Sequence, residues 1–219
     1  MRKLWVVAGL MLASTAHSQA PDPWKTAFES TFTAMDRKDE GDGVVRYIAC
    51  FKPGTGKSKC DAVAFVRRDG FRKLYFLVPG LTSEHLAATY VKTYLSIPDN
   101  QRPIVFIAPY FFGKNGWLFM NKVSIMVNGE VVIEKDLDRS SVDRDAESYG
   151  VEERGNFVAT DAQIEALRKM KPDSDVNIRL TGSKGYVSLK KSDIQSFKSE
   201  VANLLFIYDA INHALDAKR

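Results

Sequence analysis

The chain has 219 residues, of which 45% are hydrophobic and 26% are charged, and its formal net charge at pH 7 is +4. This length and composition indicate one folded domain, or at most two small ones. The charge is close to neutral, which removes the electrostatic argument for a nucleic-acid-binding protein.

The N-terminus has the three parts of a cleavable signal peptide. Arg2 and Lys3 are positive, residues 4–12 are uniformly apolar, and Ala16-His17-Ser18 fits the small-x-small pattern of a signal-peptidase site. Nine apolar residues rise about 14 Å as a helix, less than half of a bilayer core, so this run is too short for a membrane span. We expect cleavage after residue 18, which releases residues 19–219 as an exported protein, periplasmic or secreted.

The first predicted element is a helix over residues 24–38. Asp22 is a good N-cap, and Pro23 suits the first helical position. Trp24, Phe28 and Phe32 recur every four residues and predict its apolar face.

Three strands are expected next, over residues 44–51, 61–67 and 72–78. Cys50 and Cys60, the only cysteines of the chain, flank the loop between the first two strands. Because export places them in an oxidising compartment, we predict a structural disulfide that closes this hairpin loop. Their spacing does not match the C-x-x-C pattern of redox-active pairs.

The middle of the chain is predicted to contain one helix and three strands. Apolar residues recur every four positions over residues 83–96, which predicts the helix. Residues 104–112 are apolar on both faces, which predicts a central strand. Strands over residues 117–127 and 130–135 follow, and Asn128-Gly129 between them is a strong hairpin signal.

An aromatic cluster surrounds the turn that follows the central strand. Tyr110 and Phe112 precede this turn, and Trp117 follows it directly, where exposure is expected. Aromatic rings of this kind can stack on a sugar or on a peptide ring, although aromatic residues of adjoining strands also form cores. These three residues are therefore candidates for ligand binding.

Residues 136–156 are rich in charge and are expected to form a long loop with little regular structure. Four oxygen-bearing residues fall at positions 1, 3, 5 and 12 of a calcium-binding loop: Asp136, Asp138, Ser140 and Glu147. The glycine required at position 6 is Ser141 here, and Arg139 and Arg144 lie among the proposed ligands, where they would repel the ion. The segment is therefore either a Ca²⁺ site or a solvated loop crossed by ion pairs. No further cofactor is predicted.

The C-terminal part is expected to hold a helix over residues 160–171, strands over 176–180 and 186–189, and a last helix from Ser192. Apolar residues of the last helix follow alternating steps of three and four. This seam predicts a helix that buries a broad face on a sheet. A homodimer through a short coiled coil is the alternative.

Hairpins with helices inserted between them predict an α+β fold, a single domain with a mainly antiparallel β-sheet and about four helices packed on it. The closely spaced cysteine pair at the start of an exported domain resembles the invasion-associated envelope family. The chain lacks that family's second cysteine pair, so the sequence assigns no family.

The sequence contains no catalytic signature. His85 and His213 have no second histidine at helical spacing, and no nucleophile elbow is present. We therefore expect a non-enzymatic binding or accessory protein of the cell envelope, whose partner is another envelope protein or a wall component. The alternative is an envelope hydrolase in which the fold brings two carboxylates into one cleft with their pKa values pushed apart. The candidate acids are Glu130, Asp136, Asp138, Asp143, Asp145 and Glu147.

Overall fold

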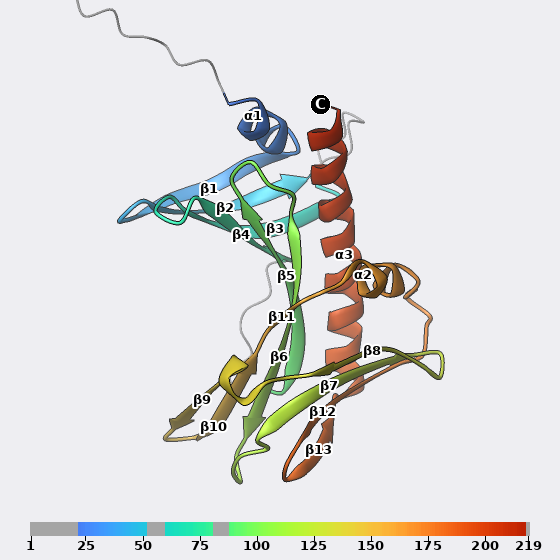
Figure 1. The fold of residues 1–219 in the computed structure, drawn as a ribbon. Helices are drawn as coiled ribbons and strands as arrows, with labels where there is room; N and C mark the ends of the chain where they lie inside the picture. Colours follow the sequence, from blue (N-terminus) through green and yellow to red (C-terminus); the bar gives the residue numbers. More distant parts are fainter. Residues whose placement is uncertain (1–21, 52–59, 81–87, 218–219) are drawn as a thin grey trace, which may run out of the picture.

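Two antiparallel β-sheets and one long helix make up most of the fold (Figure 1). The computed structural model describes residues 22–51, 60–80 and 88–217. The predicted signal peptide and the loop at residues 52–59 lie outside the described residues. Among the helices formed by the described residues, none is long and apolar enough to cross a membrane.

The first sheet has nine strands, in the order β1-β2-β3-β4-β5-β6-β10-β9, with β11 paired to β6. In chain order its strands are β1 (Phe32–Gly41), β2 (Val44–Phe51), β3 (Ala62–Asp69), β4 (Leu74–Pro79), β5 (Tyr90–Pro98), β6 (Ile104–Gly113), β9 (Val142–Glu147), β10 (Gly150–Gly155) and β11 (Phe157–Val158).

The second sheet has four strands, in the order β13-β12-β7-β8. These are β7 (Met120–Val127), β8 (Glu130–Asp136), β12 (Val176–Gly182) and β13 (Gly185–Ser188). The helices of the described residues are α1 (Pro23–Glu29), α2 (Asp161–Arg168), α3 (Lys191–Asp216) and the short 3₁₀-helix η1 (Arg139–Ser141). The α+β prediction and the mainly antiparallel sheet are confirmed, with three α-helices where about four were expected.

The core lies between the inner face of the first sheet, the second sheet and α3. Alternate residues of β6 point inward, so that Val105 and Ile107 are almost fully buried, and Leu95 of β5 lies beside them. Helix α3 packs against β5 with an apolar stripe that includes Phe197 and Leu204, both buried. Burial of each such side chain contributes roughly 1.5–3 kcal/mol.

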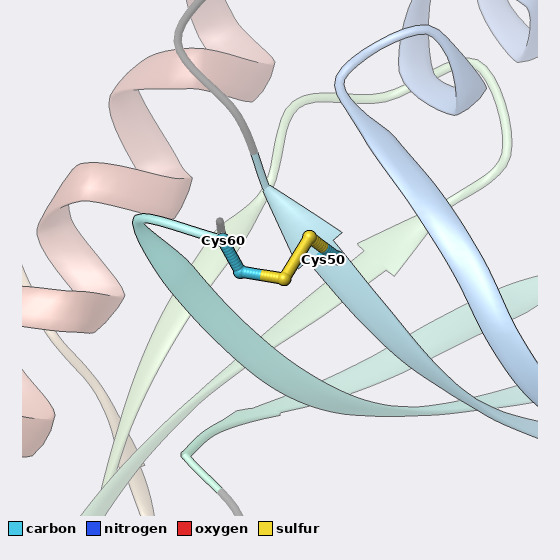
Figure 2. The surroundings of a disulfide bond; sticks show 2 residues. All are labelled: Cys50 and Cys60. Carbon is cyan, nitrogen blue, oxygen red and sulfur yellow. A yellow bond between two sulfur atoms is a disulfide. The ribbon is translucent and has the colours of Figure 1, made fainter. Parts of the chain in front are cut away.

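The disulfide joins Cys50, the second-last residue of strand β2, to Cys60, just before β3 (Figure 2). Their Cα atoms are 5.3 Å apart, and ten positions separate them in the sequence. Closure of so short a loop stabilises the fold by roughly 2.5–3 kcal/mol in the chain-entropy model. The predicted structural disulfide is confirmed, and it is compatible with an exported protein.

The predicted first helix is only half correct. Asp22 caps α1 by accepting a hydrogen bond from the Trp24 backbone N–H, but α1 ends at Glu29, and the chain then enters β1. The aromatic spacing misled the prediction, because Phe32 belongs to a strand and still packs on Phe28, with ring centroids 5.2 Å apart.

The helix predicted over residues 83–96 is wrong for its described part, which forms β5 from Tyr90 onward. Tyr90 and Tyr94 are four residues apart, and positions i and i+4 share one face in a strand as well as in a helix. Val91 and Leu95 lie on the opposite, buried face. The spacing of the tyrosines therefore could not separate the two structures.

The prediction of a long loop over residues 136–156 is also wrong. This segment contains η1 and the β9–β10 hairpin, which extends the first sheet beyond β6. The charge of the segment suits its position, because β9 is an edge strand, and exposed charges such as Asp143, Asp145 and Glu147 discourage pairing with another chain.

The C-terminal elements agree with the prediction. Thr160 and Gln163 form a reciprocal capping box at the start of α2. The apolar seam of α3 is buried against its own chain, which supports the broad-face interpretation. A homodimer through α3 would have to use the other face of the helix, where Phe206 is 36% exposed.

Candidate functional site

The aromatic residues Tyr110 and Phe112 lie on β6 and are each only 8% exposed. The ring of Tyr110 stacks on Tyr90 at 4.6 Å between centroids, and the ring of Phe112 stacks on Tyr149 at 5.8 Å. Both rings therefore pack within the protein. Trp117, the third candidate, is half-buried after the turn, and its ring lies 6.2 Å from that of Phe119.

Tyr110 belongs to a buried polar cluster with Glu152 of β10. Burial, followed by its hydrogen bond with Glu152, raises the pKa of Tyr110 above the ordinary range of tyrosine. Glu152 also accepts a hydrogen bond from the Tyr149 hydroxyl at 3.3 Å and pairs with Arg154. This carboxylate is thus occupied by partners of its own chain.

The four candidate calcium ligands do not come together. Asp136 ends β8 and pairs with Lys122 at 3.4 Å, whereas Asp138 and Ser140 lie at η1. Glu147 is at the far end of β9, about 17 Å along an extended strand from Val142. Among the residues that the structure describes, no group of three or more His, Cys, Asp or Glu side chains could hold a metal ion.

A buried carboxylate organises the region next to η1. The side chain of Glu153, on the inner face of β10, is fully buried and accepts three backbone N–H bonds. The donors are Leu118, Phe119 and Met120, at 2.7, 2.8 and 2.6 Å. Phe119 has a φ of +53°, and a left-handed residue of this kind lets successive N–H groups converge on one anion.

Arg144 of β9 is the charged partner of Glu153, with Nε 3.3 Å from Oε2. Its guanidinium also donates to the carbonyls of Arg139, Val142 and Met120. These bonds use four of the five guanidinium N–H groups, if each takes one hydrogen, and leave one on Nη2. Glu153 and Arg144 therefore fix the segment 118–120 to β9 and η1.

The turn between β12 and β13 packs on the same segment. The N–H of Ser183 donates to the Phe119 carbonyl, and the N–H of Lys184 donates to the Leu118 carbonyl at 3.2 Å. Gly182 permits this approach, because a Cβ at that position would lie 2.2 Å from the Leu118 carbonyl oxygen. Three separate parts of the sequence thus meet at one end of the molecule (Figure 1).

Between them lies a hollow of about 470 Å³, which we call the cationic hollow. Its lining residues come from the 119–121 segment, from η1 and β9, and from the β12–β13 turn: Phe119, Met120, Asn121, Arg139, Arg144, Ser183 and Lys184. The volume is that of a small-molecule site.

The charge of the cationic hollow is unbalanced. Glu153 neutralises Arg144, but Arg139 and Lys184 are exposed and have no acidic partner in the described part of the chain. The ring of Phe119 is 36% exposed beside them, with the Arg144 guanidinium 5.9 Å from its centroid. The arrangement can hold an anion next to a flat apolar surface.

A second hollow, of about 480 Å³, lies on the second sheet, and we call it the polar hollow. It is lined mainly by side chains of β7, β8 and β12: Lys122, Ser124, Met126, Val131, Glu134, Asn177, Ile178, Arg179, Thr181 and Ser188. Lys122 is balanced by Glu134 at 3.2 Å and by Asp136.

A smaller hollow, of about 230 Å³, lies near the C-terminal end of α3 and includes Trp24, Arg102 and Leu215. Arg102 there pairs with Asp216 at 2.5 Å, so the hollow has no unbalanced cation among the described residues. Among the described residues, the cationic hollow has two exposed cations without an acidic partner, the polar hollow has one, Arg179, and this smaller hollow has none, so the cationic hollow is the stronger candidate site.

The six acids considered for a hydrolase are all exposed. They are spread along β8, η1 and β9, and within the described chain none of them lines the cationic hollow or the polar hollow. The two buried acids of β10, Glu152 and Glu153, are adjacent in a strand and so point to opposite faces of the sheet.

The sequence interpretation missed Glu153, Lys184 and Asn121, and it treated Arg139 and Arg144 only as obstacles to calcium. No local pattern in the Glu152-Glu153-Arg154 run marks its two glutamates as buried, since both become buried only in the folded sheet. Recognition of a strand there would have required one glutamate to face inward and to find donors.

No protein-family model, curated protein or solved structure matches the chain.

Proposed function

We propose that the protein is an exported cell-envelope binding or accessory protein without enzymatic activity, and that the cationic hollow is its recognition surface. The observation that carries this proposal is the pair of unpartnered cations, Arg139 and Lys184, at a hollow whose base is fixed by the buried Glu153–Arg144 pair. Wall and membrane components of the envelope carry carboxylate and phosphate groups that such a site can hold.

The rigidity of the site supports binding. Glu153 holds the backbone of residues 118–120, and the β12–β13 turn is bonded to the same backbone, so little conformational freedom is lost when a ligand arrives. The disulfide of Cys50 and Cys60 agrees with a protein that works outside the cytoplasm.

The hydrolase alternative has less support. General acid and base catalysis by carboxylates requires two of them to face one cleft. The carboxylates of the described residues near the cationic hollow are either exposed along β9 or, like Glu153, occupied by several donors.

The proposal can be tested by co-sedimentation of the purified mature protein with isolated bacterial envelopes. We expect the wild-type protein to pellet with the envelopes and the Arg139→Ala/Lys184→Ala variant to bind more weakly, by about tenfold or more, because two charged contacts are lost.

The matched control is the Lys135→Ala/Lys169→Ala variant, which removes the same number of charges from exposed positions outside the hollow. It should bind like the wild-type protein. Equal loss in both double variants would show attraction by net charge alone, and unchanged binding in both would exclude the cationic hollow as the recognition surface.

A further inference from the structure

The cationic hollow and the polar hollow adjoin each other along two strands. On β7, Asn121 lines the cationic hollow and Lys122 lines the polar hollow. On the other side, Thr181 of β12 lines the polar hollow and Ser183, two residues later, lines the cationic hollow. Two residues of an extended chain span roughly 7 Å, so Thr181 and Ser183 bring the two hollows close together at this end of the second sheet, whereas the consecutive residues Asn121 and Lys122 point to opposite faces of β7. A ligand of several units can therefore reach both hollows around this end of the sheet.

Several side chains that line the polar hollow can both donate and accept hydrogen bonds. Ser124, Asn177, Thr181 and Ser188 line it, and within the described chain none of these four side chains makes a hydrogen bond. Hydroxyl and amide groups of this kind match the hydroxyl groups of a sugar, which also donate and accept. The ionised side chains of an acidic peptide only accept, so such a chain could use the acceptors of this hollow only through its backbone N–H groups, whereas every hydroxyl group of a sugar can use both kinds of partner.

Flat rings lie next to both hollows. Phe119 lines the cationic hollow, and Tyr186, which is 63% exposed, lies directly opposite Thr181 in the β12–β13 pair. Directly opposite residues of an antiparallel pair share one face of the sheet. Arg179 holds its guanidinium 4.4 Å from the centroid of the Tyr186 ring and thus orients it. Exposed rings offer stacking surfaces to the apolar faces of sugar rings.

From these features we propose that the ligand is a linear oligosaccharide that carries acidic groups. One acidic group lies in the cationic hollow between Arg139 and Lys184, and the following units lie across the polar hollow. This inference rests on the proposed function, because it takes the cationic hollow as the recognition surface, and it adds the class of ligand and its direction across β7 and β12.

Calorimetric titration of the mature protein with defined probes tests the inference. Tetragalacturonate should bind at least about tenfold more tightly than monogalacturonate, since the tetramer reaches both hollows. Its fully methyl-esterified form, which has no charge, should lose this binding. A tetramer of glycerol phosphate carries acidic groups but no sugar ring, so binding as tight as that of tetragalacturonate would show a general polyanion site and would overturn the inference.

Variants separate the two hollows. The Asn177→Ala/Ser188→Ala variant should bind tetragalacturonate more weakly and monogalacturonate with unchanged affinity. The Arg139→Ala/Lys184→Ala variant should bind both ligands more weakly. Equal affinity for tetramer and monomer would show that the ligand does not extend into the polar hollow, and this outcome would overturn the inference.

Tetraglutamate is the remaining probe, and binding as tight as that of tetragalacturonate would identify an acidic-peptide site instead. If tetragalacturonate does not bind while envelopes are still bound through Arg139 and Lys184, the saccharide inference fails and the proposed function stands. Loss of that envelope binding as well would remove the proposed function itself.

Discussion

At the scale of single residues, Glu153 determines the shape of the candidate site. A carboxylate that accepts three backbone N–H bonds and an arginine bond is favourable in a buried position only because each of its donors is in place. The same bonds hold Phe119 in its left-handed conformation and keep Arg144 at the edge of the hollow.

Glu153→Gln should therefore destabilise the protein on the order of 3 kcal/mol, because the amide turns its own N–H groups toward backbone donors and leaves Arg144 without a counter-charge. Urea unfolding at pH 7 measures this change. Asp145→Asn on exposed β9 is the control and should shift stability by less than about 0.5 kcal/mol. A Glu153→Gln variant as stable as the control would show that the carboxylate is not essential to the site.

At the scale of elements, the interface between α3 and β5 contains an unusual group, Glu200. This residue is 8% exposed, and its Oε2 atom is buried without a hydrogen-bond partner in the described structure. Burial raises the pKa of Glu200 to about 7, and Lys92 offsets a small part of this rise. The carboxyl group is thus protonated in the folded protein at a pH where it ionises in the unfolded chain.

The folded state consequently binds one more proton than the unfolded state between about pH 4.5 and 7, so this group makes stability fall as pH rises through that window. Glu200→Gln should leave stability unchanged near pH 4 and increase it on the order of 2 to 3 kcal/mol at pH 8.

Denaturant unfolding of both proteins across pH 4–8 measures the difference, with exposed Glu130→Gln as the control that should show no such trend. A Glu200→Gln variant that is less stable than the wild-type protein at pH 8 would contradict this account of the α3–β5 interface.

The elements also show what a sequence can predict. β2, β6 and α2 follow from local signals, namely an apolar run beside a cysteine, a run that is apolar on both faces, and a capping box. β5 does not follow from a local signal, because residues four apart share a face in both a helix and a strand. Only its pairing with β4 and β6 makes this segment a strand.

The candidate site was less predictable than the fold. Asn121, Arg139 and Lys184 come from separate segments, and no local pattern indicates that the second sheet folds back to place them around one hollow. Trp117, a predicted ligand-binding residue, has its ring 6.2 Å from that of Phe119, and it is Phe119 that lines the hollow. The charge of residues 136–156 suggested a loop because burial of Glu152 and Glu153 depends on partners far away in the sequence, namely Tyr110 for Glu152 and the backbone of residues 118–120 for Glu153.

At the scale of the whole molecule, the disulfide and α1 lie far from the features that can bind a ligand, whereas Glu153 contributes to both stability and the candidate site. The disulfide, α1 and the C-terminal end of α3 lie toward one end, and the β9–β10 and β12–β13 hairpins lie toward the other (Figure 1). Substitutions in the hairpins that line the hollows can therefore alter binding while the core around Leu204 and Ile107 is kept.

The most direct measurement is a backbone amide NMR titration of residues 19–219 with solubilised envelope fragments. The proposed function predicts that shifted amides concentrate at residues 117–121, 139–144 and 181–188, and that the Arg139→Ala/Lys184→Ala variant needs about tenfold or more of the fragments to reach the same shifts. Shifts that instead cluster around Trp24 and Leu215, at the opposite end of α3, would contradict the cationic hollow as the binding surface.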